Sequence, residues 1–325
     1  MRVHVRPFQT DDYAAIAALN NTNFPEFEEF ADEFKIQDEQ RPAHCRAGRW
    51  VAADPTGRVV GFAEYDQHVT TYHPRFFNLE VVVEPACIGH GIGRHLWRVL
   101  VDAVGAHDPL SVDMWTREDM PCRVAFLEHR GFVPDMRIWS SELDLTRFDP
   151  APFAPAVEAA LGQGFQIRSL AELRGSDPDV ERKLYALWCE VHDDVPIPPG
   201  QEQQHRTFDD WRRRNLLNPT LFPEAYFVAR DGDAYVGTTQ LWRAPDASRL
   251  RTGLTGVRRP FRRRGLALAL KVHALAFAKA QGFGSVCTEN ASTNVGMLAV
   301  NEQLGFVRRP AWVHYAASWE ALGGT

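Results

Sequence analysis

One pattern occurs twice in this chain, and it constrains the possible fold more than any other feature. In each half, a strand-like apolar run ends at a valine and is followed by a tight turn rich in glycine or arginine, and then by a helical pattern. The same number of residues separates Val83 from Gly131 as separates Val257 from Gly305. A turn glycine also follows each valine at one common distance. Landmarks that agree in spacing predict a duplicated domain.

A proline-rich stretch separates the two copies. Residues 149–155 contain Pro150, Pro152 and Pro155, which neither continue a helix nor fit a central strand. We therefore expect an N-terminal domain over residues 1–148, a linker over 149–164 with a short helix near its end, and a C-terminal domain over 165–325. The length of 325 residues also suits two domains.

Each copy is predicted to be an α/β domain with a mixed sheet, because period-2 and period-3.6 apolar patterns alternate along it. In the first copy we expect strands near Val3–Arg6, Arg49–Ala53, Val59–Tyr65, Phe76–Val83, Leu110–Trp115 and Phe132–Leu145, and helices near Asp11–Leu19, Phe27–Phe34, Ile92–Val104 and Pro121–Arg130. In the second copy we expect strands near Phe165–Arg168, Ala225–Ala229, Ala234–Trp242, Leu250–Val257, Ser285–Glu289 and Phe306–Tyr315, and helices near Val180–Val191, Phe208–Asn215, Gly265–Gln281 and Asn294–Leu304.

Charge and cysteine content exclude several classes of protein. The formal net charge of −6 argues against a general nucleic-acid-binding protein, and the arginines clustered at 258–264 favour a small anionic ligand instead. The five cysteines are scattered and form no C-x-x-C pair, which argues against disulfides and structural zinc. No apolar run is long enough to span a membrane or to form a signal peptide. We expect a cytoplasmic protein without a metal, a nucleic-acid partner or a membrane partner.

The turn between strand and helix is the chemically informative part of each copy. Such a turn directs backbone N–H groups to one point at the positive end of a helix dipole, and glycine lets the backbone approach an anion closely. A Walker A loop would need Gly-Lys-Ser/Thr, which neither turn has. A dinucleotide-binding loop would follow the first strand of its domain, whereas these turns follow several strands. A nucleotide and the pyrophosphate of coenzyme A both remain candidate ligands.

The second turn resembles the acetyl-CoA-binding motif of the GNAT family of N-acetyltransferases. That motif is Arg/Gln-x-x-Gly-x-Gly/Ala after a strand valine, and Arg262, Gly265 and Ala267 fill its positions. In the first copy, Gly91 and Gly93 match, but Ile88 stands where Arg or Gln is expected. Downstream, the family's second helix and its Gly-Phe ending are matched by Asn290, Asn294, Met297, Asn301, Gly305 and Phe306. The resemblance covers nearly the whole chain and implies two tandem GNAT domains.

The resemblance also implies where acetyl-CoA binds. The pantetheine arm pairs with the fourth strand of a splayed sheet, which corresponds to Val81–Val83 in the first copy and Thr255–Val257 in the second. The pyrophosphate rests on the amides of the turn, with arginine side chains nearby. The implied cofactor-binding residues are Val81, Val83, Gly89, His90, Gly91, Ile92, Gly93 and Arg94 in the first copy, and Thr255, Val257, Arg262, Arg263, Arg264, Gly265, Leu266, Ala267, Leu268 and Asn294 in the second.

Catalysis requires a base for the ammonium proton and, in many family members, a tyrosine as acid on the last helix. That tyrosine is replaced by Leu127 in the first copy and Asn301 in the second. Tyr315, on the predicted final strand of the second copy, is a substitute acid. Glu80 is the candidate base of the first copy and Glu289 that of the second. Glu190 and His192 are further options in the second copy.

The sequence therefore predicts an acetyl-CoA-dependent N-acetyltransferase that acts on the amine of a small molecule by direct transfer in a ternary complex. The C-terminal copy is expected to be catalytic, while the N-terminal copy is expected to be degenerate or to bind coenzyme A weakly. Two alternatives stay open: a non-catalytic acyl-CoA sensor or scaffold, and a thiol-sugar acetyltransferase like mycothiol synthase, a tandem member of the family. The acceptor and the oligomeric state are not predicted.

Overall fold

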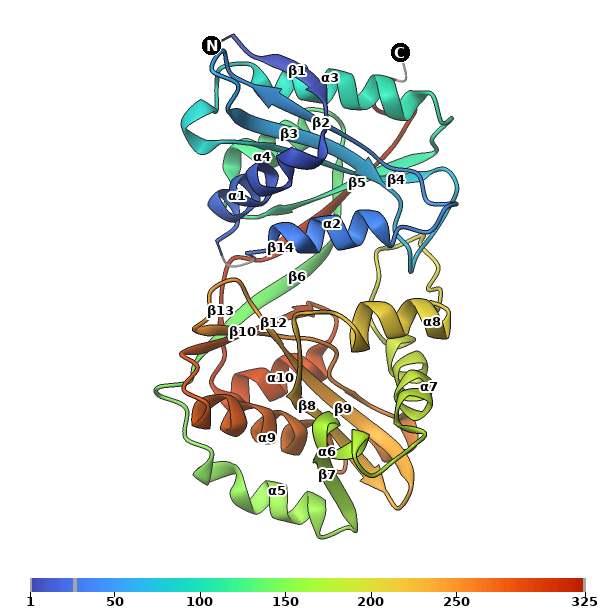
Figure 1. Cartoon of the computed structure of the whole chain (residues 1–325), viewed down its shortest axis with the longest axis vertical. Coiled ribbons are helices and arrows are strands. Elements are labelled where there is room, and N and C mark those ends of the chain that lie inside the picture. Colours follow the sequence, from blue (N-terminus) through green and yellow to red (C-terminus); the bar gives the residue numbers. More distant parts are fainter. Residues whose placement is uncertain (1, 26–27, 324–325) are drawn as a thin grey trace. The chain divides into compact units, whose positions relative to one another are not determined.

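The α/β prediction is confirmed. The computed structural model describes residues 2–25 and 28–323, and the chain forms two compact units (Figure 1). Unit 1 comprises residues 1–137, 197–204 and 311–325, and unit 2 comprises residues 138–196 and 205–310. Each unit contains a mixed sheet with helices packed on it. Within the described residues, we found no helix with both the length and the apolar character needed to cross a membrane.

The sheet of unit 1 has the strand order β1-β2-β3-β4-β5-β14. Its strands are β1 (His4–Pro7), β2 (Gly48–Ala53), β3 (Val59–Asp66), β4 (Phe76–Val83), β5 (Ser111–Arg117) and β14 (Trp312–Ser318). All neighbours are antiparallel except β4 and β5, which run parallel. Alternate residues of each strand point to opposite faces, so both faces carry apolar side chains that require a cover of helices.

Two pairs of helices cover this sheet. Helix α3 (Ile92–Gly105) packs its buried stripe on one face, together with α4 (Pro121–Glu128). Helices α1 (Tyr13–Asn23) and α2 (Ala31–Glu39) cover the other face, where Val51, Phe62 and Val82 form the contact. Phe27, the first residue of the helix predicted over Phe27–Phe34, lies outside the described residues. Short 3-10 turns occur at η1 (Thr10–Asp12) and η2 (Pro85–Cys87).

The sheet of unit 2 repeats this topology, in the order β6-β12-β10-β9-β8-β7. Its strands are β6 (Val133–Asp144, of which residues 138–144 lie in unit 2), β7 (Phe165–Ser169), β8 (Leu221–Asp231), β9 (Ala234–Arg243), β10 (Arg249–Thr252) and β12 (Ser285–Ala291), with short strands β11 (Gly256–Val257) on β9 and β13 (Val307–Arg308) on β6. Its helical segments are η3 (Ala151–Phe153), α5 (Ala154–Leu161), α6 (Leu170–Arg174), α7 (Val180–His192), α8 (Phe208–Trp211), η4 (Arg212–Leu216), η5 (Arg259–Phe261), α9 (Leu266–Ala280) and α10 (Val295–Leu304). Only β10 and β12 run parallel.

The last strand of each sheet comes from the other half of the sequence, which the predicted boundaries did not anticipate. β14, at the C-terminal end, pairs with β5 from Trp312 opposite Arg117 to Ser318 opposite Ser111. Residues 138–144 of β6 pair with β12. The compact units therefore differ from the continuous domains predicted over 1–148 and 165–325. Sequence spacing predicts that a final strand exists, but the strand it pairs with is decided by long-range packing.

The parallel pair of each sheet separates after a short ladder. In unit 1 the β4–β5 pairing ends at Asn78 opposite Asp113, so the remainder of β4 diverges from β5. We call this opening the unit 1 split. In unit 2 the corresponding pairing ends at Arg251 opposite Cys287, which defines the unit 2 split. A splayed parallel pair leaves backbone groups on both strands without ladder partners, and these groups need another partner when they are buried.

The two splits differ in the backbone of the strand before the turn. β4 pairs with β3 residue for residue from Asn78 to Val83. In unit 2, Thr252 lies opposite Leu241 and Gly256 opposite Thr238, so three residues of one strand face two of the other. This is a β-bulge, and it re-aims the backbone amides of residues 253–255.

Candidate functional site

Both turns have the backbone geometry of an anion-binding nest. Gly89 and Gly91 have φ angles of 86° and 81°, and the corresponding Arg263 and Gly265 have φ angles of 63° and 79°. Gly91 and Gly265 are the N-caps of α3 and α9, so the first free N–H groups of both helices point out of the turn. Arg263 is a non-glycine residue held in the left-handed region, a strained conformation that is typical of functional sites.

A cavity of about 690 Å³ opens at the turn of unit 1. Its inner wall is apolar and comes from β4, β5 and α4, including Val81, Met114 and Leu127. Seven of the eight residues predicted to bind the cofactor in this copy line it, namely Val81, Val83, Gly89, Gly91, Ile92, Gly93 and Arg94. The turn and the strand before it thus form one continuous surface. The eighth, His90, hydrogen-bonds through Nδ1 to the carbonyl of Cys87, over 3.3 Å.

The mouth of this cavity carries positive charge. Arg94 and Arg130 both line it, and the pKa of Arg130 is lowered by burial and by the nearby Arg94. The Arg130 guanidinium lies 3.6 Å from the centroid of the Phe126 ring. Among residues 2–25 and 28–323, no carboxylate is ion-paired with either arginine. Two guanidinium groups that lack a carboxylate, beside a nest of amides, fit an anionic ligand such as a phosphate.

The unit 1 split is crossed by an ion pair. Arg123, from the first turn of α4, donates to Oε1 of Glu80 over 2.6 Å and to the carbonyl oxygen of Val81 over 2.7 Å. Glu80 Oε1 also accepts the Val81 amide over 3.0 Å. The predicted base of this copy is therefore held by a guanidinium. Its Oε1 is therefore occupied by the Arg123 guanidinium and by the Val81 amide, and a substrate ammonium group would have to compete with both.

A buried acidic and histidine cluster lies beside this split in unit 1. Asp113 on β5 lies 3.3 Å from Nε2 of His68 and 3.4 Å from Nε2 of His314, and His314 Nδ1 lies 2.5 Å from Asp135. Burial opposes the charge on Asp113, but its contacts with His314 and His68 outweigh burial and lower its pKa. Burial likewise opposes the charge on His314, and its carboxylate partners outweigh that and raise its pKa. The cluster holds charges of both signs inside the fold.

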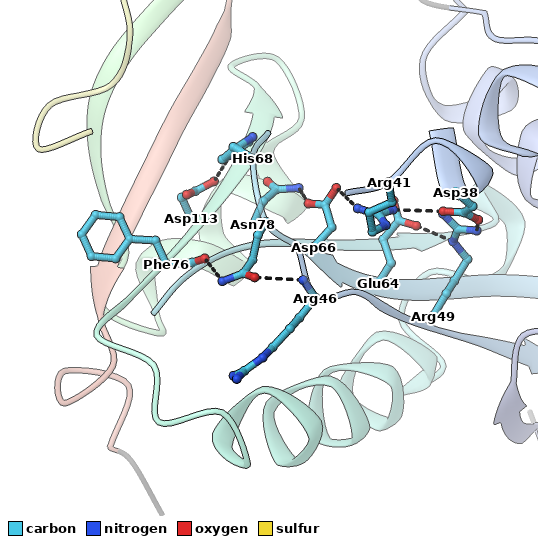
Figure 2. Close-up of polar contacts among 11 residues, drawn as sticks. Asp38, Arg41, Arg46, Arg49, Glu64, Asp66, His68, Phe76, Asn78 and Asp113 are labelled. Carbon is cyan, nitrogen blue, oxygen red and sulfur yellow. Dashed lines mark hydrogen bonds and ion pairs between the residues drawn. The ribbon is translucent and has the colours of Figure 1, made fainter. Parts of the chain in front are cut away.

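Figure 2 shows that polar side chains continue from this cluster along the face of the sheet that α1 and α2 cover. Asn78 donates to Asp66 over 3.1 Å, and Asp66 pairs with Arg41. Asp38 forms ion pairs with both Arg41 and Arg49. Arg49 also forms an ion pair with Glu64. This row of polar side chains therefore ends at α2 and β2. Burial raises the pKa of Glu64 although Arg49 opposes the shift. The charged groups in this row are paired with one another.

In unit 2, protein groups contact the turn. Asp194, which follows α7, forms ion pairs with Arg259 and Arg262, and Arg262 Nε donates to the carbonyl of Val257 over 2.9 Å. Arg264 donates no ion pair to a carboxylate in the described chain, and its carbonyl accepts a bond from Gln163. Helix α5, in the predicted linker, packs beside Gly265. Arg262 is thus joined to the end of α7 as well as to the strand before the turn.

The unit 2 split contains an unpaired buried acceptor. Asn301 on α10 is 2% exposed and donates through Nδ2 to Oδ1 of Asn290 on β12, over 2.6 Å. Its own Oδ1 is buried without a hydrogen-bond partner. Asn294 caps α10 by accepting the Met297 amide over 3.3 Å. A buried amide oxygen without a partner is unfavourable unless a ligand supplies a donor, and the amide groups of a pantetheine arm are such donors.

Glu289 is an exposed carboxylate on a strand that borders the unit 2 split. It lies on β12, two residues beyond Cys287, where the β10–β12 ladder ends. Its side chain reaches solvent, yet the surrounding protein partly desolvates the carboxylate and raises its pKa to about 7, against the opposing effect of Arg251. A carboxylate with a pKa near neutrality is suited to accept a proton at physiological pH.

Some predicted residues are not brought together. Tyr315 lies on β14 opposite Met114 and is buried in the core of unit 1, so its predicted place on the last strand of the second copy's sheet is wrong. Thr255 is hydrogen-bonded to Thr239, over 2.7 Å. Sequence reasoning missed Arg123, which occupies the third position of a predicted helix but gives no signal that its side chain crosses the split. It also missed Asp194 as the partner of the turn arginines.

Comparison with known proteins agrees with this geometry. The model of the family described as "Acetyltransferase (GNAT) family" matches twice, over residues 13–132 and 184–306. The chain belongs to the GNAT acetyltransferase family. Members of this family use acetyl-CoA, and transfer of an acetyl group to an amine is the activity that membership supports. The prediction of two tandem GNAT domains is confirmed, because the two matches fall in the two halves of the chain.

Relatives and solved structures match most of the length of this chain. The mycothiol acetyltransferase of Thermobispora bispora is 27% identical over 241 residues, which cover 73% of this chain and 74% of the relative. The mycothiol acetyltransferase of Salinispora arenicola is 27% identical over 289 residues, which cover 87% of this chain and 85% of the relative. A tandem GNAT protein from the clavulanic acid biosynthesis pathway matches 98% of both chains with a TM-score of 0.73 and 19% identity. A GCN5-related N-acetyltransferase from Sphaerobacter thermophilus matches 97% of this chain and 95% of its own, with a TM-score of 0.69 and 20% identity.

Proposed function

We propose that this protein transfers the acetyl group of acetyl-CoA to the amine of a small molecule, by direct transfer in a ternary complex within unit 2. The observation that carries the proposal is the combination of Glu289 and Asn301 at the unit 2 split. Glu289 is a solvent-accessible carboxylate with a pKa of about 7, and Asn301 provides a buried acceptor that has no hydrogen-bond partner among the described residues. Unit 1 has no matching pair, since Trp115 and Leu127 occupy the corresponding positions.

Each residue of unit 2 has a defined task in this proposal. Bound acetyl-CoA supplies the activated thioester. The turn amides and Arg263 bind its phosphates, and Asn301 Oδ1 accepts a hydrogen bond from its arm. The Gly253 amide is already bonded to the Gln240 carbonyl, so the amides of Leu254 and Thr255 are the ones placed to donate to the carbonyl oxygen on which negative charge develops. Glu289 removes the proton from the attacking ammonium group, directly or through one water molecule. Holding both reactants together supplies much of the remaining rate.

The acceptor that we propose to test first is a thiol-sugar amine. Both relatives named above are mycothiol acetyltransferases, and they align with most of this chain. At 27% identity the acceptor pocket has room to diverge, so other small amines belong in the same screen.

We propose that unit 1 binds coenzyme A but does not transfer the acetyl group. Its cavity of about 690 Å³ joins the nest to β4, and its mouth is basic. Its candidate base, Glu80, is held by Arg123, and Leu127 replaces the tyrosine that often serves as acid.

The first experiment titrates acetyl-CoA and coenzyme A into the wild type and into Gly91→Glu and Gly265→Glu variants. A carboxylate at either turn repels the pyrophosphate there. Gly91→Asn and Gly265→Asn are the matched controls, because asparagine tolerates the left-handed region that both glycines occupy. We expect each Glu variant to lose one of two sites. Absence of binding to the wild type would overturn the proposal.

The second experiment measures turnover on a panel of amines that includes a cysteinyl amino sugar. We expect Gly265→Glu to abolish turnover and Gly91→Glu to retain it. Tight binding of acetyl-CoA without turnover of any amine would instead favour a non-catalytic acyl-CoA sensor.

A further inference from the structure

Arg123 makes contacts on both sides of the unit 1 split. On the β4 side it donates to Glu80 and to the Val81 carbonyl. On the β5 side its Nε donates to Oγ1 of Thr116 over 3.1 Å, and NH2 lies 3.4 Å from the carbonyl of Trp115. Its guanidinium also lies 5.2 Å from the centroid of the Phe24 ring, at the end of α1. The guanidinium therefore closes the opening that the splayed strands create.

The ion pair satisfies both backbone groups of one residue. The N–H and C=O of a strand residue point to the same side, and those of Val81 point away from β3, toward β5. Arg123 donates to the Val81 carbonyl, and Glu80 accepts from the Val81 amide. A ligand group that sought either bond would have to displace a charged side chain. Charge-assisted hydrogen bonds are stronger than neutral ones, so this displacement is costly.

At the corresponding positions of unit 2, the residues that form this closure are replaced. Met297 is the third residue of α10, as Arg123 is the third residue of α4. Leu254 and Thr255 occupy the stretch that corresponds to Glu80 and Val81. The two copies therefore share the turn but differ at the inner end of the arm-binding strand. The difference lies where an acyl group on the thiol end of coenzyme A would be placed.

Arg123, Val81 and Met114 line the same cavity as the nest. The space between the nest and the split is mainly apolar and reaches the closed opening. It can take a pantetheine arm that ends in a thiol. An acetyl group extends that end by a carbonyl and a methyl group, and these meet the guanidinium and an amide already bound by Glu80.

We propose that unit 1 is a binding site for free coenzyme A, and that Arg123 is the residue that excludes the acetylated form. The inference rests on the proposed binding of coenzyme A to unit 1 and adds the identity of the preferred species. A unit that prefers the free thiol responds to the product of the reaction that unit 2 carries out, rather than to its substrate.

The test uses the full chain with Gly265→Glu, so that only unit 1 binds. Coenzyme A and acetyl-CoA are titrated separately by calorimetry. We expect coenzyme A to bind at least about tenfold more tightly, since acetyl-CoA must break a charge-assisted hydrogen bond. Arg123→Met, which introduces the residue that unit 2 has at this position, is then added to the Gly265→Glu protein. We expect the Kd values for coenzyme A and acetyl-CoA to come within about threefold of each other, mainly because acetyl-CoA binds more tightly.

Arg130→Met is the matched control, because it removes another cavity arginine at the opposite, phosphate-facing end. It should weaken both ligands by the same factor and leave their ratio unchanged. Arg123→Gln serves as a second variant that removes the guanidinium while keeping a polar side chain, should Arg123→Met fail to fold, and it is expected to bring the two affinities closer in the same direction. Equal affinity for the two ligands in the Gly265→Glu protein would overturn the inference while leaving the proposed site intact. Absence of binding by either ligand would overturn the proposed unit 1 site and the inference with it.

Discussion

Asn301 on α10 donates its amide hydrogen to Asn290 on β12, over 2.6 Å, and its own amide oxygen is left buried without a partner. Helix α10 is thereby fixed to β12, one of the two strands that border the unit 2 split. The unpaired oxygen is an unfavourable feature of the free protein, and it becomes favourable once a ligand donates to it.

Replacement of this asparagine is expected to separate cofactor affinity from stability. Asn301→Leu, which introduces the residue of unit 1, should raise the KM for acetyl-CoA about tenfold through loss of one hydrogen bond. The Tm should change little, because the lost hydrogen bond to Asn290 is offset by removal of the unsatisfied Asn301 oxygen. Steady-state kinetics and thermal unfolding test both parts. An unchanged KM with a lower Tm would mean that the asparagine is purely structural.

Glu289 is expected to set the pH dependence of catalysis. A base acts in its deprotonated form, so with a pKa of about 7 the wild-type kcat/KM should rise with pH through neutrality and then level off. Glu289→Gln should lower kcat roughly 100- to 10,000-fold and remove the rise of kcat/KM with pH. Glu302→Gln, at an exposed carboxylate of α10, is the control. A Glu289→Gln protein that keeps the wild-type pH profile would exclude the base role.

Lys271 on α9 is expected to cost stability near neutral pH. It is 3% exposed, lies 5.0 Å from the Phe306 ring, and burial lowers its pKa to about 7. The unfolded chain binds this proton up to about pH 10.4, so wild-type stability should rise with pH between about 7 and 10.4. Lys271→Met should add about 1–3 kcal/mol at pH 7 and flatten this rise.

Urea unfolding at pH 7 and pH 10 measures both effects. Lys35→Met, at an exposed lysine of α2 whose ion pair with Glu39 spans 3.9 Å, controls for the loss of a lysine. If Lys271→Met lowered the free energy of unfolding at both pH values, the result would show that the folded protein stabilises the charged lysine.

The cluster around Asp113 is expected to stabilise unit 1 in acid more than in base. His314 is 2% exposed and its pKa is raised, so its contribution is complete below the ordinary imidazole pKa near 6.5 and is lost as pH rises through the raised value. Asp113 has a lowered pKa, and its contribution is lost only when the pH falls below the ordinary range of a carboxyl. Asp113→Asn should therefore cost about 3–5 kcal/mol at pH 6 and clearly less at pH 9.

Denaturant unfolding at these two pH values checks the sign. Asp119→Asn, near the end of the same strand, removes an exposed ion pair with Arg117 and should cost less than about 1 kcal/mol. If Asp113→Asn lowered the free energy of unfolding by the same amount at pH 6 and pH 9, the result would contradict a charged His314.

The repeat, the turns and the family follow from the sequence because they depend on local spacing. A valine before the turn, Gly91 or Gly265 at the helix N-cap, and a Gly-Phe ending each act within a few residues of themselves. Apolar periodicity likewise predicted the order of helices and strands in both copies. Asn301 was identified as the position of the family's usual tyrosine, and Glu289 as one of three options for the base of the second copy.

Only the tertiary structure decided which strands complete each sheet and which side chains meet across the splits. The pairing of β14 with β5 puts Tyr315 in unit 1, and no local pattern specifies the partner of a final strand. The path of Arg123 to Glu80 depends on how α4 packs over the opening. The pKa of Glu289 depends on the protein that surrounds it. Local sequence fixes backbone conformation and motif, whereas partner choice and electrostatic environment arise from contacts between residues distant in the chain.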